Sequence, residues 1–324
     1  GRSLNNLKVT SNPSNQNLSM TVTSKEVDGD IEWRNPSKTQ ETGAVVARLK
    51  KLHIPVSNEA ADNSAENKEI KRLDKQYPAL DIQADDFKLG KKAFGTFALN
   101  AYETEGDWVI QQLKISNPDG LLVAEGLWHN WTTNPNTNLQ FSLTANDVGN
   151  TLKRFGQPDV IKGGVALISG QLRWPGSPHQ FNKKGLNGEF RLGASKGQVV
   201  KAKPGVGRLF GLLTLQSLPR RLTLDFRDLF SEGFAFDKIS ANAKINDGIM
   251  HSDDFFMTGP ATEIEIKGDI DLNKETQFLN VKVIPHISDS LSLAALAGGP
   301  IAGAAAFVAQ KLLKDPLNKI AQSE

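Results

Sequence analysis

The sequence predicts a mainly β protein in which most of the chain forms one long antiparallel meander. Apolar and polar residues alternate along most of its length, which is typical of strands with one buried face. Turn-forming segments separate these runs, and the 324 residues include 28 Gly and 15 Pro. The connections between strands are short, which favours antiparallel neighbours, because a parallel return needs a crossover of about a dozen residues or more.

The clearest strand runs over 264–272, where every odd position is charged and every even position is apolar or Gly. The same alternation predicts further strands around Phe97, Leu99, Ala101, Trp108, Ile110, Leu139, Phe141, Leu143, Leu186, Phe190, Leu192, Leu222, Leu224, Phe226, Leu279, Val281 and Val283. Turns are expected at 28–29, 117–120, 195–197 and 246–248, where Gly follows Asp or Lys. About a dozen strands would result.

Three helical segments are expected beside the strands. Residues 147–155 carry apolar side chains at helical spacing. In residues 205–218 the Leu side chains gather on one side of the expected helix, which ends before Pro219. The third segment lies in 290–310, which has no charged residue and is rich in Ala and Gly.

The uncharged segment predicts a short turn, a break at Gly298-Gly299-Pro300 and a helix over 301–313. We expect this helix to pack on the sheet or its mouth. Contact with a membrane surface and a true membrane span are the alternatives, which the high Ala content disfavours. The side chains expected to contact a membrane or a partner are Ile301, Phe307, Val308 and Leu312.

Composition excludes several classes of function. Lys and Arg number 38 against 36 Asp and Glu, a net charge of +2, so the basic surface of a nucleic-acid binder is not expected. The sequence has no Cys, which excludes thiol chemistry, Cys-ligated zinc and disulfides.

No catalytic motif is found. The five His are scattered, and the one local group of potential ligands, His251-Ser252-Asp253-Asp254, fits the polar edge of a strand better than a metal site. A Walker motif is absent from the sequence. We therefore expect neither an enzyme nor a cofactor. A glycan-binding face using Trp128 and Trp131 is an alternative, although large aromatics more often cap a sheet.

Residues 205–237, GVGRLFGLLTLQSLPRRLTLDFRDLFSEGFAFD, closely resemble the carboxy-terminal region of the YhdP family of AsmA-like envelope proteins of Gram-negative bacteria. Shorter matches are DIEW at 30–33, GQLRWPGSP at 170–178, GPIAG at 299–303 and QKLL at 310–313. The resemblance spans the chain from about residue 30 to its end. The long central motif is the specific part of it.

The resemblance implies a long curled antiparallel sheet that forms an open apolar groove over 1–287, followed by a C-terminal helical segment over 288–324. It also implies a periplasmic protein that moves phospholipid between the inner and outer membranes. In the full-length protein an anchor would hold it to the inner membrane, and we expect the present sequence to be a fragment that lacks this anchor. Its partners would be phospholipid and the two membrane surfaces.

A sheet with one apolar face must cover that face, and few helices are available to do so. Acyl chains could cover it, with headgroups kept in water at the open edge. The groove-lining candidates are Phe141, Phe190, Leu224, Phe226, Phe236, Ile264, Ile266, Ile270, Val281 and Val283. The alternative is a structural or adaptor β-sandwich of the cell envelope that docks a partner through its C-terminal helix.

Overall fold

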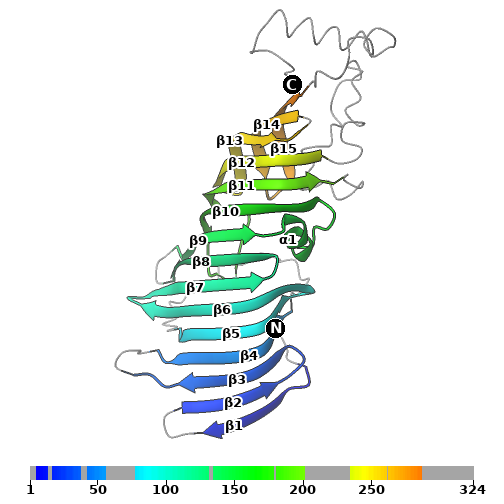
Figure 1. The fold of residues 1–324 in the computed structure, drawn as a ribbon. Coiled ribbons are helices and arrows are strands. Elements are labelled where there is room, and N and C mark those ends of the chain that lie inside the picture. The colour runs from blue at the N-terminus through cyan, green and yellow to red at the C-terminus, as the bar shows by residue number, and fades with distance from the viewer. Residues whose placement is uncertain are drawn as a thin grey trace, which may run out of the picture. The chain divides into compact units, whose positions relative to one another are not determined.

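The computed structural model describes residues 5–13, 17–37, 42–55, 77–130, 134–178, 180–200, 234–260 and 262–286. These residues form 15 strands and one helix, and the strands make a single sheet whose spatial order is the chain order from β1 to β15 (Figure 1). The mainly β prediction is therefore confirmed, with more strands than the dozen expected. Because β1 and β15 are the two ends of this order, the sheet is open.

The strands have the following bounds. They are β1 (Lys8–Pro13), β2 (Asn17–Thr23), β3 (Val27–Arg34), β4 (Ala44–Ile54), β5 (Ala79–Leu89), β6 (Lys92–Thr104), β7 (Asp107–Asn117), β8 (Gly120–His129), β9 (Asn136–Ala145), β10 (Ile161–Pro175), β11 (Asn187–Val199), β12 (Phe234–Asn246), β13 (Ile249–Thr258), β14 (Thr262–Asp271) and β15 (Thr276–Pro285).

The chain divides into two compact units. The first comprises 1–145, 154–156 and 169–188, and the second comprises 146–153, 157–168 and 189–324. Strands β1 to β9 belong to the first unit and β12 to β15 to the second, while β10 and β11 contribute residues to both. The boundary expected between 287 and 288 lies outside the described residues.

One strand pair departs from the predicted antiparallel meander. Strands β4 and β5 run parallel, with Ala44 opposite Ala79 and Ile54 opposite Leu89. Every other pair whose register is described, β1 to β9 and β12 to β15, is antiparallel. The connection over 55–78 is long enough for a crossover return, which is what a parallel neighbour requires.

Two of the four predicted turns are confirmed and two are wrong. Residues 117–120 join β7 to β8, and residues 246–248 join β12 to β13, with positive φ at both Asp247 and Gly248. Residues 28–29 instead lie inside β3, where Gly29 has a φ of 139° at a register shift. Residues 195–197 lie inside β11, with Lys196 at a φ of 56°. A bend within a continuing strand favours the same residue types as a turn does. Bends and turns therefore look alike in the sequence.

Apolar residues share one face of the first unit. One cross-strand row is apolar at every position from β2 to β9, and its members are Met20, Ile31, Ala47, Ile82, Leu99, Leu113, Ala124 and Phe141. A parallel row consists of Leu49, Ala84, Phe97, Ile115, Leu122 and Leu143. We call this side of the first unit the apolar face. Alternation places the intervening polar residues, such as Arg48 and Lys114, on the opposite, polar face.

The second unit has a core built in the same way from β12 to β15. Ile239, Met257, Ile264 and Val283 form one cross-strand row, and Phe255, Ile266 and Val281 form the next. Phe236 and Ile264 are the largest fully buried apolar side chains of this cluster, at 2% and 0% exposed. Partly buried residues from β10 and β11 pack against it.

The helix predicted over 147–155 is present as α1 (Val148–Arg154). The carboxylate of Asp147 accepts a hydrogen bond from the amide of Asn150 at 2.8 Å, as an N-cap residue does. The helices predicted over 205–218 and 301–313 lie outside the described residues. Among those that are described, no helix is long and apolar enough to cross a membrane.

Candidate functional site

The apolar face of the first unit is the candidate site. Leu99, Leu113 and Phe141 stand in its central row, and each remains partly exposed to solvent. Two alanines interrupt the larger residues of the row: Ala47 lies between Ile31 and Ile82, and Ala124 lies between Leu113 and Phe141. A sheet face of this composition offers a strip of apolar side chains that runs across the strands rather than along one of them.

Two small clusters pack tightly at separate places on this face. Trp108, Ile110 and Trp128 are buried around Ala101, and Leu49 is buried beside Ala84 in the other cluster. Between these anchors most of the row residues are only half-buried. The face therefore combines fixed packing at a few positions with accessible apolar surface at others.

The predicted groove residues fall into three groups. Phe236, Ile264 and Ile266 lie in the buried core of the second unit. Phe141, in the central row of the first unit, and Phe190, Ile270, Val281 and Val283 are half-buried. Leu224 and Phe226 lie outside the described residues, as do the residues predicted to contact a membrane or a partner, Ile301, Phe307, Val308 and Leu312.

Sequence reasoning missed the apolar positions of β2 to β5, among them Met20, Ile31, Leu49 and Ile82. Each stands in an alternating segment, so the signal was present in the sequence. Their common face becomes evident only from the register, because β4 and β5 pair in parallel.

In contrast, the polar face carries charged pairs across neighbouring strands. The guanidinium of Arg48 lies 2.6 Å from the carboxylate of Asp81, and the imidazole of His53 lies 2.7 Å from Asp86. The hydrogen bond from His53 lowers the pKa of Asp86 below its ordinary value. In the part of the chain that the structure describes, no three potential ligands are grouped so as to hold a metal ion.

The cluster at 251–254 is a polar ladder on the second unit. His251 contacts the carboxylate of Asp269 through Nδ1 at 2.7 Å and that of Asp253 through Nε2 at 3.0 Å. These hydrogen bonds, the one to Asp269 first, raise the pKa of His251 above its ordinary 6.5. Asp254 accepts a bond from the backbone amide of Asn242 at 2.8 Å. The interpretation of this group as a polar strand edge agrees with these contacts.

The stability of the second unit should depend on pH through His251. A raised pKa means that the folded state holds the proton more tightly than the unfolded state. The stabilisation is therefore complete below pH 6.5 and is lost as the pH rises through the folded-state pKa. Denaturant unfolding of wild type and His251→Gln from pH 5.5 to pH 9 measures this pH dependence of stability. We expect the difference between the two proteins to shrink as the pH rises, and a constant difference would contradict the assignment.

Trp128 does not offer a glycan-binding surface. Its side chain is 9% exposed, and its ring centroid lies 4.8 Å from that of Tyr77 and 6.4 Å from that of Trp108 in edge-to-face contacts. Trp174 is buried as well, and its indole N–H donates to the carbonyl of Ser177 at 3.1 Å. Trp131 lies outside the described residues. Trp128 and Trp174 are thus packing residues, as the sheet-capping interpretation predicts.

Comparison with known proteins identifies the family to which this sheet belongs. The model of the family described as YhdP protein matches residues 1–324, the whole chain. The chain belongs to the YhdP family. The resemblance carried by 205–237 is thereby confirmed.

A curated member of the YhdP family is the intermembrane phospholipid transporter YhdP of Escherichia coli strain K12. It is 35% identical over 201 residues, which cover 61% of this chain and 16% of that protein. The matched region is thus a small part of the length of this YhdP relative. No solved structure matches the chain.

Proposed function

We propose that this chain forms part of a conduit that carries phospholipid between the inner and outer membranes along its apolar face. The observation that supports this most directly is the row from Met20 to Phe141, which is apolar at every strand from β2 to β9 and half-exposed at several positions. The Escherichia coli relative is named as an intermembrane phospholipid transporter, which agrees with this role.

The mechanism follows from the composition of the row. Acyl chains laid across it bury methylene groups, each contributing about 0.8 kcal/mol. A lipid that moves from one strand to the next exchanges apolar contacts for similar ones, so it meets no deep energy minimum. The headgroup stays in water beside the strand ends, because burial of a charged phosphate without partners is costly. No step of this mechanism needs a catalytic residue or a cofactor.

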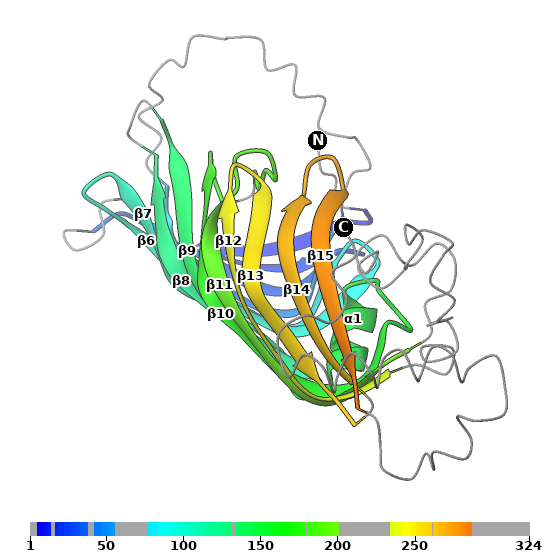
Figure 2. The same ribbon diagram turned by 90° about the horizontal axis from the view of Figure 1, so that it is seen from above.

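The curl of the sheet into an open groove belongs to the same proposal. Figure 2 shows that β13, β14 and β15 bend along their length. In the second unit we assign the groove lining to the half-buried Phe190, Ile270, Val281 and Val283, and the supporting core to Phe236, Ile264 and Ile266.

The surroundings of the conduit are also proposed. The chain would act in the periplasm as part of a protein held at the inner membrane. Its segment over 288–324, with Ile301, Phe307, Val308 and Leu312, would contact a membrane at the far end.

Mass spectrometry of organic extracts from the purified chain tests the proposal. The chain is purified without detergent beside a version that ends at Ile287. We expect stoichiometric phospholipid in both proteins, because the lipid would lie on the sheet. Lipid in the longer protein alone would place binding in the terminal segment and leave the sheet without this role. Lipid in neither protein would overturn the conduit and favour an adaptor that docks a partner through its C-terminal segment.

A further inference from the structure

The first unit buries two indole N–H groups close to each other on its apolar face. The indole nitrogens of Trp108 and Trp128 are buried, and neither has a hydrogen-bond partner among the described residues. A buried indole N–H usually finds an acceptor, because an unpaired donor loses its hydration without compensation. The two residues stand opposite each other on β7 and β8, and their ring centroids lie 6.4 Å apart. We call these two residues the indole pair.

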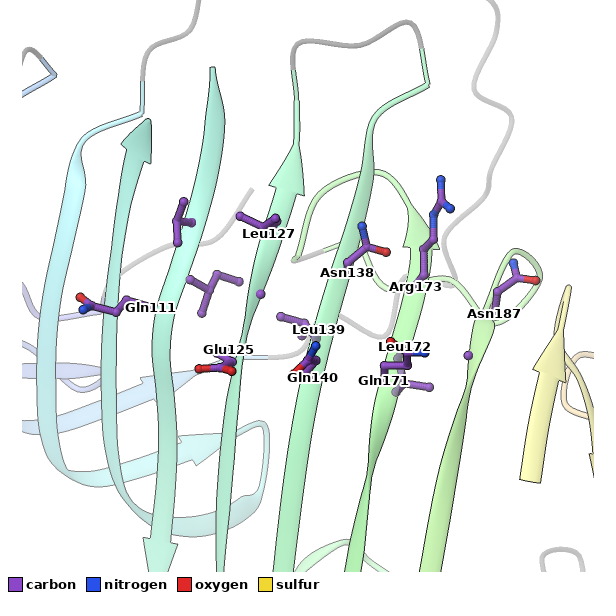
Figure 3. Close-up of a pocket in the computed structure, with 14 residues that line it drawn as sticks. Gln111, Glu125, Leu127, Asn138, Leu139, Gln140, Gln171, Leu172, Arg173 and Asn187 are labelled. Carbon is purple, nitrogen blue, oxygen red and sulfur yellow. The ribbon is translucent and has the colours of Figure 1, made fainter. Parts of the chain in front are cut away.

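A cavity with a volume of about 630 Å³ adjoins the indole pair. Its lining is mainly apolar and includes Ile110, Gly126 and Leu139, which stand in one cross-strand row. Ile110 and Leu139 also pack in the cluster that contains the indole pair. Leu172 lines the cavity from the neighbouring strand β10, beside Leu139 of β9 (Figure 3). Because Gly126 has no side chain, the row leaves a hollow between Ile110 and Leu139.

Polarity changes in steps along the strands at this end of the sheet. The indole pair lies two residues nearer the strand ends than the row of Ile110, a distance of about 7 Å. Asp107 and His129 follow at the ends of β7 and β8, where the imidazole lies 2.8 Å from the carboxylate. Apolar surface, two neutral donors and a charged edge thus succeed one another. A diacyl phospholipid has the same order in its acyl chains, its two ester carbonyls and its headgroup.

Partly exposed side chains cover the indole pair. The ring centroid of Tyr77 lies 4.8 Å from that of Trp128, and Leu99, Leu113 and Leu139 pack against the cluster. All four of these covering residues are only half-buried. A ligand can therefore reach the indole N–H groups when side chains rotate, without separation of the strands.

Charge beside the indole pair favours a neutral acceptor. Glu103 of β6 stands opposite Trp108 in the same cross-strand row, so its carboxylate lies on the same face. This carboxylate accepts a hydrogen bond from the backbone amide of Tyr77 at 2.7 Å. A phosphate placed at the indole pair would be repelled by the half-buried carboxylate. The uncharged carbonyl oxygen of an ester meets no such repulsion.

From these observations we propose that the indole pair binds the ester carbonyls of a diacyl phospholipid whose acyl chains enter the adjoining cavity. Each indole N–H donates to one carbonyl oxygen, and the headgroup remains in water beyond Asp107 and His129. The pair would fix the depth at which the lipid lies on the apolar face and would select ester-linked over ether-linked lipids. This inference rests on the proposed lipid conduit and adds to it the residues that recognise the lipid.

Competition between ester and ether lipids tests the indole pair. The purified intact chain is incubated with vesicles that contain equal amounts of dioleoylphosphatidylcholine and its dioleyl diether counterpart, which lacks only the two ester carbonyls. Mass spectrometry then measures the ester-to-ether ratio of the lipid bound to the chain. Trp108→Phe and Trp128→Phe keep an aromatic ring and remove the N–H. We expect each of them to lower the ratio about fivefold relative to wild type.

Trp174→Phe is the matched control. Trp174 is also buried in the first unit, but its indole N–H already donates to the carbonyl of Ser177 at 3.1 Å. Its replacement should leave the ratio unchanged. All variants take lipid from the same vesicles, so any difference in how firmly the vesicles hold the two lipids cancels. Circular dichroism establishes that the variants are folded.

Nuclear magnetic resonance of wild type with nitrogen-15-labelled Trp gives a second readout that needs no folded variant. We expect two of the five indole N–H resonances to shift when the chain is loaded with the ester lipid and to stay in place with the ether lipid.

The outcomes separate this inference from the conduit on which it rests. If both lipids bind and the ratio is the same in wild type, Trp108→Phe and Trp128→Phe, the indole pair is overturned and the conduit stands. An equal fall of the ratio in Trp174→Phe would assign the effect to packing and would also overturn the pair. If wild type binds neither lipid, the conduit itself is overturned, and the indole pair with it.

Discussion

Replacing Phe141 with Asp is expected to abolish lipid loading of the chain while leaving it folded. Phe141 stands on β9 at the end of the central apolar row, opposite Ala124, and is half-buried. A carboxylate at this position keeps its hydration because the side chain is partly exposed, so folding tolerates it. An acyl chain lying across the row would remove that hydration, at a cost of several kcal/mol. Mass spectrometry of extracted phospholipid and transfer between labelled vesicles both measure the effect.

The next residue of the same strand supplies the control. Ser142 projects from the opposite side and pairs with Val123, so Ser142→Asp adds the same charge to the polar face. We expect its lipid content to equal that of wild type. Circular dichroism establishes that both variants are folded. Equal lipid content in the two variants would exclude the apolar face as the lipid path.

Truncation of Ile264 should produce the largest loss of stability. Ile264 is 0% exposed and stands between Met257 and Val283 in the core of the second unit. Ile264→Ala removes buried methyl groups and leaves a cavity that the neighbouring strands cannot fill, at a cost of about 2–5 kcal/mol. The midpoint of urea unfolding measures this loss. Hydrogen exchange of β12 to β15 provides a second measurement on the strands of the second unit.

The matched control for this substitution is Ile249→Ala on the neighbouring strand. Ile249 is 46% exposed at the first position of β13, so little apolar contact is lost there. We expect a change of no more than about 1 kcal/mol. Similar losses at the two positions would mean that Ile264 is not the centre of a packed core.

Much of the fold could be predicted because local patterns decide it. The alternation over 264–272 corresponds to β14, and the Asn246-Asp247-Gly248 turn joins β12 to β13 as expected. The apolar spacing over 147–155 predicts α1, and the structure adds Asp147 as its N-cap. In each case the residues that carry the signal are neighbours in the chain, and the structure they specify is local.

Features that depend on distant partners could not be predicted. The parallel pairing of β4 with β5 depends on how the chain returns over 55–78, which alternation within either strand does not encode. Gly29 resembles a turn residue, although its role is to relieve a close approach to the carbonyl of Arg48 inside a strand.

The strands lie in the sheet in the same order as in the chain, and this affects how such a protein can change in length. Each strand pairs with the strand before it and the strand after it in the chain, so the contacts between strands follow the order of the sequence. Insertion of one hairpin adds two strands and preserves both the direction of every later strand and the side to which its apolar residues point. The span of the sheet can thus evolve in increments of about 10 Å. Duplication of a single hairpin would suffice to fit the same architecture to a wider gap.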